Sequence, residues 1–112
     1  MSPPLREPTY FVLASLLDGA LHGYAIIKRA EELSEGRVRM TAGTLYGALD
    51  RLADEALVEV EREEVVQGRP RRYYRLTAIG ADRLSAEATR LSAAVRVVAD
   101  RVPMLKARLE SA

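Results

Sequence analysis

Apolar residues recur at helical spacing in three segments of the first half of the chain. In residues 42–52 they occupy positions i, i+3, i+4 and i+7, which places them on one face of a helix. The same periodicity predicts a helix over residues 23–33. Residues 9–18 are apolar on most sides, so we expect a largely buried helix there, capped by Thr9 and ended by Asp18-Gly19. The apolar positions of the segment 42–52 are Leu45, Ala48, Leu49 and Leu52.

Alternating polar and apolar positions predict strands between and after these helices. Residues 57–62 and 71–76 both alternate, and the segment 67–70 between them contains the glycine and proline typical of a turn. Together these segments predict a β-hairpin. Residues 37–40 also alternate, so we expect a short strand directly before the helix over residues 42–52.

The last third of the chain carries apolar residues at alternating steps of four and three, a heptad repeat typical of helix–helix packing. Thr77 should cap this helix. A helix from Ala78 to Val102 would be about 37 Å long, too long for the rest of a small domain to cover. We therefore expect its apolar stripe to form a two-fold dimer interface; the alternative for part of it is packing on the chain's own first helix. Pro103 should kink this helix or begin a new short one. The predicted interface residues are Leu84, Ala88, Leu91, Val95, Val98 and Val102.

The exposed face of the predicted helix over residues 42–52 has little side-chain cover. Gly43 and Gly47 lie on it with Asp50 and Asp54, and Thr41 is a good N-cap for this helix. Each glycine costs about 1 kcal/mol of helix stability relative to alanine, so the bare backbone should have a use. One use is close approach to a polyanion, because free amides at a helix N-terminus favour phosphate. The other is close helix–helix packing inside the protein, and this pattern alone does not separate the two.

Charge is segregated along the chain, although the net charge of its 112 residues is only +1. Residues 54–64 contain six acids and one arginine, whereas residues 67–75 contain four arginines and no acid. The tip of the predicted hairpin is therefore basic. Arginines near the strand base can pair with glutamates of the first strand, whereas Arg69 and Arg71 at the tip are better placed to contact a partner. The excess of 15 arginines over 2 lysines suits bidentate phosphate contacts, but a GC-rich genome explains it better.

The sequence offers little on which to build an enzyme. It has no cysteine, which excludes disulfides and thiolate metal sites, and its one histidine, His22, has no evident catalytic partners. We interpret His22, beside a helix start, as a structural hydrogen-bonding residue. There is no run of 18 apolar residues and no recognisable signal peptide. We expect a cytoplasmic protein that uses no cofactor or metal.

The order of these elements predicts an α+β, mainly α fold. Two helices, a short strand, a third helix, a hairpin and a long helix together make a winged helix-turn-helix with a two-stranded β-hairpin wing and a long C-terminal dimerisation helix. We expect a DNA-binding domain over residues 1–77 and a dimerisation helix and tail over residues 78–112. In this fold the third helix enters the major groove of DNA, which gives the bare helix and the basic hairpin a common use.

Four sequence blocks, in this order and at this spacing, resemble the signature of PadR-family transcriptional regulators. They are Leu21-His22-Gly23-Tyr24, Gly43-Thr44-Leu45-Tyr46, residues 68–77 and Gly80. The resemblance covers roughly residues 5–84 and is closest to the compact subfamily. It implies a homodimeric repressor that binds a palindromic operator in double-stranded DNA, and in some members a small-molecule effector relieves repression. Certain compact members bind flat aromatic drugs between tryptophans; this chain has no tryptophan, which argues against that binding mode.

The resemblance and the predicted fold together indicate a DNA-binding surface. Tyr46 matches the tyrosine that reaches DNA in the family; the alternative is a partly buried core tyrosine. Asp50 has three interpretations: it accepts from cytosine N4, pairs with Arg51 or Arg29, or lies off the groove. A winged-helix module that binds another protein without specific DNA binding is the alternative function, and the low net charge favours it. The residues expected at DNA are Lys28, Thr41, Ala42, Gly43, Thr44, Tyr46, Arg51, Arg69, Arg71 and Arg72.

Overall fold

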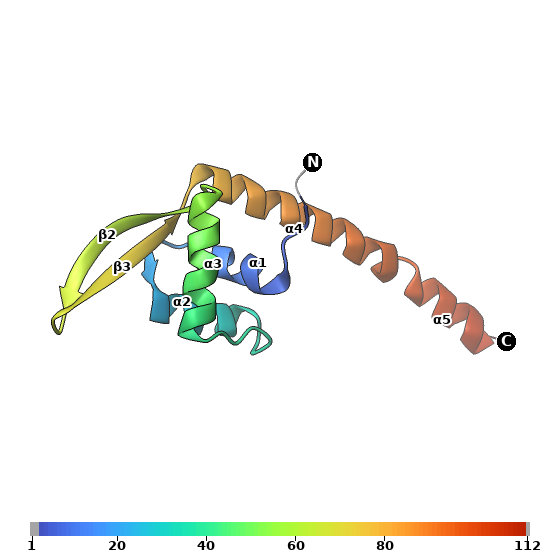
Figure 1. Ribbon diagram of the computed structural model, residues 1–112. Coiled ribbons are helices and arrows are strands. Elements are labelled where there is room, and N and C mark those ends of the chain that lie inside the picture. The colour runs from blue at the N-terminus through green and yellow to red at the C-terminus, as the bar shows by residue number, and fades with distance from the viewer. Residues whose placement is uncertain (1–2, 112) are drawn as a thin grey trace.

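A computed structural model describes residues 3–111, which form a winged helix extended by a long C-terminal helix (Figure 1). This confirms the predicted fold class. The helices of the domain are α1 (Glu7–Ala14), α2 (Gly23–Leu33) and α3 (Ala42–Asp54). The strands are β1 (Leu21–His22), β2 (Val58–Val66) and β3 (Arg69–Leu76). The C-terminal helices are α4 (Ala78–Ala99) and α5 (Val102–Ser111).

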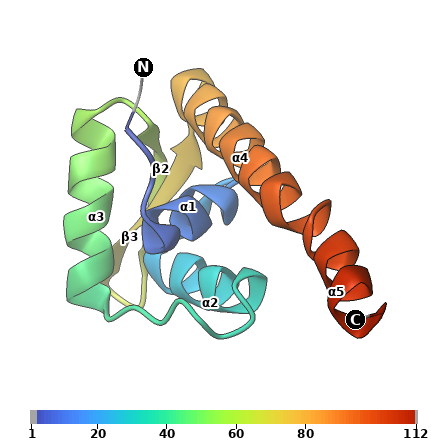
Figure 2. The same cartoon turned by 90° about the vertical axis from the view of Figure 1, so that its right-hand side faces the viewer.

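The core forms around α1, which lies between α2 and the first turns of α4 (Figure 2). The apolar face predicted for α3 is buried, and Leu45 and Leu49 have no exposed surface. Burial of a leucine is worth about 1.5–3 kcal/mol, so these contacts hold α3 in place and leave its opposite face to solvent. The core comprises Val12, Leu13, Leu16, Ile26, Leu45, Leu49, Leu52, Leu57, Val58, Tyr74 and Leu84.

The hairpin of β2 and β3, which we call the wing, is longer and more tightly turned than predicted. Its antiparallel pairing runs from Val58 opposite Leu76 to Val66 opposite Arg69. The turn consists of Gln67 and Gly68 alone, at φ values of 50° and 76°. Two successive residues at positive φ match the two-residue turn whose twist fits a hairpin. Arg69 and Pro70, expected in the turn, therefore belong to β3.

Two strand predictions need correction. Residues 37–40 form no strand, because no strand among the described residues lies beside them; the Val38 amide instead donates to Ser34 Oγ at 2.9 Å. A two-residue strand forms at β1, directly before α2, where the sequence predicts none. It pairs with Tyr73 and Tyr74 of β3, so the sheet has three strands in the order β1-β3-β2.

The first helix is shorter than predicted and begins earlier. It starts at Glu7 because Pro8 fits the first turn of a helix, where its missing amide hydrogen is not needed. Thr9 is therefore inside the helix and is not its cap. Residues 15–18 form a turn after the helix ends at Ala14.

The first turns of α4 belong to the domain core. Thr77 Oγ1 accepts a hydrogen bond from the Gly80 amide at 2.9 Å, which confirms Thr77 as the cap. A Cβ atom at Gly80 would lie 2.1 Å from the carbonyl oxygen of Leu57, so this glycine allows α4 to approach the start of β2 closely. Leu84, which we expected in the dimer interface, is only 6% exposed and packs in the core of its own chain.

Beyond Glu87 the C-terminal helices project away from the domain. Every residue from 88 to 111 is exposed, and the molecule reaches 70 Å in its longest dimension (Figure 1). Pro103 lies in the first turn of α5, so of the two outcomes predicted for it, the start of a new helix is observed. In the described chain, 3–111, every helix is too short or too polar to cross a membrane.

Candidate nucleic-acid interface

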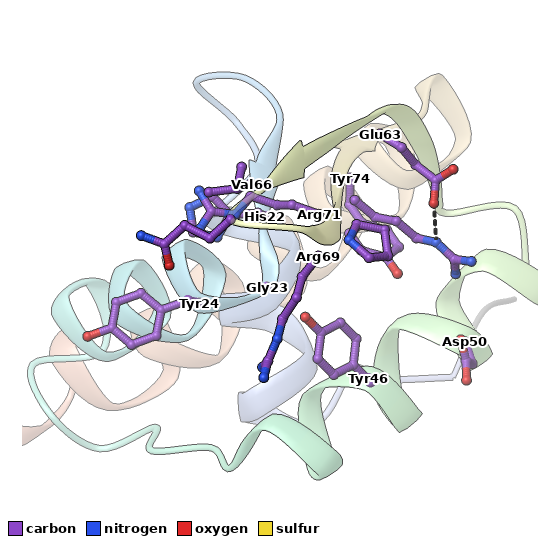
Figure 3. Close-up of a pocket in the computed structure, with 13 residues that line it drawn as sticks. His22, Gly23, Tyr24, Tyr46, Asp50, Glu63, Val66, Arg69, Arg71 and Tyr74 are labelled. Carbon is purple, nitrogen blue, oxygen red and sulfur yellow. Dashed lines mark hydrogen bonds and ion pairs between the residues drawn. The ribbon is translucent and has the colours of Figure 1, made fainter.

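A cleft of about 1000 Å³ lies between the wing and the helix pair α2–α3 (Figure 3). Its lining comes from three parts of the chain. The start of α2 contributes Gly23 and Tyr24, α3 contributes Tyr46 and Asp50, and the wing contributes arginines of β3. Residues more than 40 positions apart in the sequence therefore share one space.

The N-terminal half of α3 presents almost bare backbone to solvent. Thr41 Oγ1 accepts from the Thr44 amide at 3.2 Å and caps the helix, while residues 41–44 are all exposed. A Cβ atom at Gly43 would meet no described atom within 4 Å, and one at Gly47 would meet only the Arg51 guanidinium, at 3.8 Å. Close helix–helix packing inside this chain therefore does not account for either glycine. This face of α3 is open to contact with another molecule.

Tyr46 sits half-exposed at the edge of the cleft. Its side chain is held by α2, because a Cβ atom at Gly23 would lie 2.5 Å from Tyr46 Oη. The residue is 47% exposed. Of the two interpretations of Tyr46, this placement favours a surface residue over a core one, and it gives Gly23 a role that the sequence did not reveal.

The wing arginines divide into paired and unpaired groups. Arg72 Nε donates to Glu63 at 2.9 Å, and Arg75 forms an ion pair with Glu59 nearer the wing base. Among residues 3–111, no carboxylate lies within 4.0 Å of the guanidinium of Arg69 or Arg71. Arg69 and Tyr46 point into the cleft from the wing and from α3 (Figure 3). The cleft thus contains two guanidinium groups without an internal partner.

Two predicted contacts lie outside the cleft but close to it. Lys28 is exposed and follows Tyr24 by four residues, so both lie on the same side of α2. Arg51 is exposed, and its guanidinium lies beside Gly47 on the bare face of α3. Arg51 therefore borders the bare face of α3, and Lys28 lies on the side of α2 that carries Tyr24.

His22 lines the cleft and caps α2. Its Nδ1 accepts from the Ala25 amide at a long 3.5 Å, and its ring packs edge-on against Tyr73, with 5.5 Å between centroids. Burial, and then the charge of Arg71, lower the pKa of His22 below its usual value of 6.5. The structure thus shows the structural hydrogen bond that we expected. Nowhere in residues 3–111 do three or more His, Cys, Asp or Glu side chains group as metal ligands would.

The model of the PadR-like family of transcriptional regulators matches residues 12–86. The chain belongs to this family. PadR-like proteins are regulators and not enzymes, in agreement with the absence of a catalytic constellation predicted from the sequence. The matched span contains α2, α3, the wing and the core part of α4, and so includes every element that lines the cleft.

Two relatives and a solved structure are similar to this chain. A transcriptional regulator of Mycobacterium tuberculosis, Rv3488, is 36% identical over 78% of this chain and 78% of its own length. An uncharacterised 37.1 kDa protein in a transposon of Streptomyces fradiae is 43% identical over 74% of this chain, but the match spans only 22% of that protein. The crystal structure of Bacillus subtilis PadR in complex with operator DNA has the same fold, with a TM-score of 0.62 over 95% of this chain and 75% of that chain, at 22% identity.

Proposed function

We propose that this PadR-like protein is a homodimeric repressor that binds a palindromic operator in double-stranded DNA. In this proposal α3 enters the major groove, and the wing contacts the adjacent phosphate backbone. The observation that carries it is the cleft: the bare face of α3 and the unpaired guanidinium groups of Arg69 and Arg71 border the same space. The operator complex of Bacillus subtilis PadR supports the proposal, because a protein of this fold binds DNA.

The proposed contacts follow from the placement of each group. At the N-terminus of α3, the uncapped amides of Ala42 and Gly43 and the exposed hydroxyls of Thr41 and Thr44 donate hydrogen bonds to phosphate oxygens. Tyr46 reaches the DNA with its hydroxyl or its ring edge. Arg69 and Arg71 of the wing contact the phosphate backbone of the DNA. Arg72 makes a third contact when a phosphate replaces Glu63 as its ion-pair partner. Lys28 and Arg51 contact the backbone beside α3.

We assign dimerisation to residues 78–112, with the interface starting at Ala88 because Leu84 is used in the core. Leu91, Val95 and Val98 follow on one side of α4, Val102 begins α5, and all four are exposed in the single chain. A two-fold pairing of these helices presents two copies of α3 to two half-sites, separated by one helical turn of DNA, about 34 Å, or a multiple of it. Residues 1–77, with the first turns of α4, form the DNA-binding domain. A repressor of this kind acts on the chromosome in the cytoplasm.

Fluorescence anisotropy with the duplex upstream of the protein's own gene tests this proposal, because repressors commonly regulate themselves. A scrambled duplex of the same length serves as the control, and each is measured at two salt concentrations. We expect tight, selective binding that weakens steeply with salt, since each neutralised phosphate releases counterions. Equal and weak binding to both duplexes, together with a stable complex with another protein, would instead favour a protein-binding module.

Effector relief is a separate part of the proposal and rests on the family resemblance. A small molecule that binds between the protomers would alter the spacing of the two α3 helices and release the operator. Addition of candidate compounds to the preformed operator complex tests this, with loss of anisotropy as the signal. Transcription in vitro from the bound promoter distinguishes repression from activation.

A further inference from the structure

Two acidic side chains, Asp50 and Asp54, lie on the face of α3 that the proposed function directs at DNA, and of the two only Asp50 lines the cleft. Asp50 is exposed, follows Tyr46 by one helical turn, and lines the same cleft as Arg69 (Figure 3). A carboxylate close to phosphates is repelled by them. Asp50 therefore needs a hydrogen-bond donor in the DNA that offsets this repulsion.

The neighbours of Asp50 determine what it can reach. At 100° per residue, Gly43, Gly47 and Asp50 lie within about 60° of one another around the helix axis. Neither glycine carries a side chain, and the space beyond each is open except for the Arg51 guanidinium near Gly47. Asp54 shares this sector but lies at the last residue of α3 and outside the cleft. Asp50 is therefore the side chain that projects from the middle of this face, where a helix lying in a groove faces the base edges. Tyr46 and Arg51 flank it.

Asp50 is not neutralised within its own chain. Across the described residues, no nitrogen of an arginine, lysine or histidine lies within 4.0 Å of its carboxylate. Arg29 pairs with Asp18 and Glu32, and Arg72 pairs with Glu63. Pairing with Arg29 or Arg51, two of the partners considered from the sequence, is therefore not observed, and the acceptor capacity of Asp50 is unused.

We propose that Asp50 is a specificity-determining residue that accepts a hydrogen bond from the N4 amine of a cytosine in each operator half-site. This inference rests on the proposed function. A carboxylate can only accept, and cytosine is the base whose major-groove edge offers a donor without an adjacent acceptor. Guanine and thymine present acceptors, and adenine places its N7 acceptor beside its N6 amine, which repels a carboxylate. The phosphates, on the groove rims, are further from the centre of this face than the base edges are.

Selection of binding sites from a randomised duplex pool tests this inference with the full-length protein, Asp50→Ala and Asp50→Asn. We expect the wild-type protein to select a cytosine at one position of each half-site. Asp50→Ala should lose that preference alone, and its affinity for the selected site should fall about 5- to 150-fold per half-site contact, while its affinity for unrelated DNA is unchanged or higher. Asp50→Asn should shift the preference towards adenine, because an amide pairs with adenine N6 and N7.

A second measurement isolates the amine itself. The selected cytosine is replaced by 2-pyrimidinone, which lacks the N4 amine, and affinities are compared in a double-mutant cycle. We expect the replacement to weaken the wild-type protein and to affect Asp50→Ala much less. Asp82→Ala, which removes an exposed carboxylate on α4 outside the cleft, should behave as wild type in both experiments.

Two results overturn the inference in different ways. If Asp50→Ala keeps the same cytosine preference, or simply binds every duplex more tightly, then Asp50 repels phosphate and reads no base; the proposed function survives. If the wild-type protein selects no sequence from the pool, the inference and the proposed function fail together.

Discussion

Three glycines outside the turns serve three different purposes, and the surroundings of each residue separate them. Gly80 allows α4 to pack against the backbone of Leu57, where a Cβ atom has no room. Gly23 leaves space for the ring of Tyr46. Gly47 has open space beyond it apart from one guanidinium, so only a contact outside the chain gives it a use. Glycine is therefore needed for core packing at Gly80, for the position of Tyr46 at Gly23, and for the open surface of α3 at Gly47.

Substitution of Gly47 by alanine should separate stability from DNA binding. Alanine favours the helix by about 1 kcal/mol and meets no obstacle within the chain, so we expect a higher melting temperature. We also expect affinity for operator DNA to fall roughly tenfold, because an extra methyl group holds α3 away from the groove. Thermal denaturation and anisotropy on the same samples measure both effects.

Gly80→Ala is the matched control, since it makes the same change in the core. Its Cβ atom collides with the carbonyl of Leu57, and overpacking of this kind costs about 1–3 kcal/mol. The melting temperature should therefore fall. If Gly47→Ala gained stability and retained full affinity, the bare face of α3 would not lie against DNA.

His22, the only histidine of the chain, should make the folding stability depend on pH near and below the ordinary histidine pKa of about 6.5. Because burial and Arg71 lower its pKa in the folded state, the unfolded chain binds more protons, and folding stability rises with pH. The contribution is complete above the unfolded pKa of about 6.5, and is lost as the pH falls through the lower folded pKa. Protonation also removes the acceptor that caps α2 at Ala25.

Urea unfolding at several pH values between 5.5 and 7.5 measures this effect. The wild-type protein should unfold more easily at the acidic end. His22→Asn keeps a cap acceptor without titrating, so its stability should change less across the range. His22 is the only histidine in the chain. If the stability of both proteins changed equally with pH, a side chain other than histidine would be responsible.

At the scale of the element, the wing combines ion pairs near its base with unpaired guanidinium groups towards its tip. Arg75 and Arg72 are paired with Glu59 and Glu63, whereas Arg71 has no carboxylate partner in the described part of the chain. Exposed ion pairs contribute little to stability, so the pairs mainly reduce the charge that the wing base offers to DNA. The phosphate contacts should therefore concentrate towards the tip.

Arg71→Ala should lower the salt dependence of operator binding. Each phosphate contact contributes about 0.9 to the slope of log K against log salt, so loss of one contact per protomer should reduce the slope by about two in a dimer. Arg75→Ala, in the same strand but paired at the base, should leave the slope nearly unchanged. An equal slope for wild type and Arg71→Ala would remove Arg71 from the DNA contacts.

The helices that could be predicted from the sequence are those whose own periodicity buries one face. α2, α3 and the first turns of α4 belong to this group, and Thr41 and Thr77 cap helices as expected. The wing strands were predictable for another reason, their alternation on both sides of a glycine-containing turn, although β2 is exposed over most of its length. β1 was missed because two residues cannot establish an alternation; the strand exists only because β3 lies beside it. The converse holds for residues 37–40, which alternate but have no strand to pair with.

The candidate site was predictable in its charges and helix face but not in its assembly. The bare face of α3 and the basic tip of the wing both follow from local patterns. The participation of Gly23, Tyr24 and His22 depends on how the start of α2 packs against β3 and Tyr46, and no local pattern contains that contact. Likewise, a heptad repeat does not show where the domain ends, and for this reason Leu84 was assigned to the wrong surface.

At the scale of the whole molecule, the apolar stripe of the projecting helices should hold two copies together. Val95 and Val98 lie on the stripe with Leu91 and are 63% and 59% exposed in the single chain. Burial of this surface against a second copy removes it from water. An aspartate at Val98 would bury an unpaired charge in each half of a two-fold interface.

Val98→Asp should therefore weaken the dimer by roughly 100-fold or more, measured by analytical ultracentrifugation. Val97→Asp is the matched control: Val97 is similarly exposed, at 56%, but lies about 100° from Val98 and 160° from Val95 around the helix, off the stripe. The Val97→Asp protein should remain dimeric.

Loss of the dimer in Val98→Asp should also lower operator affinity, because each domain then binds its half-site without a second domain held nearby. We expect a loss of about 10²- to 10⁴-fold. If Val98→Asp stayed dimeric, or if Val97→Asp dissociated equally, the stripe would not be the interface. A monomeric Val98→Asp that bound the operator as tightly as wild type would instead show that one copy of α3 and one wing suffice for recognition.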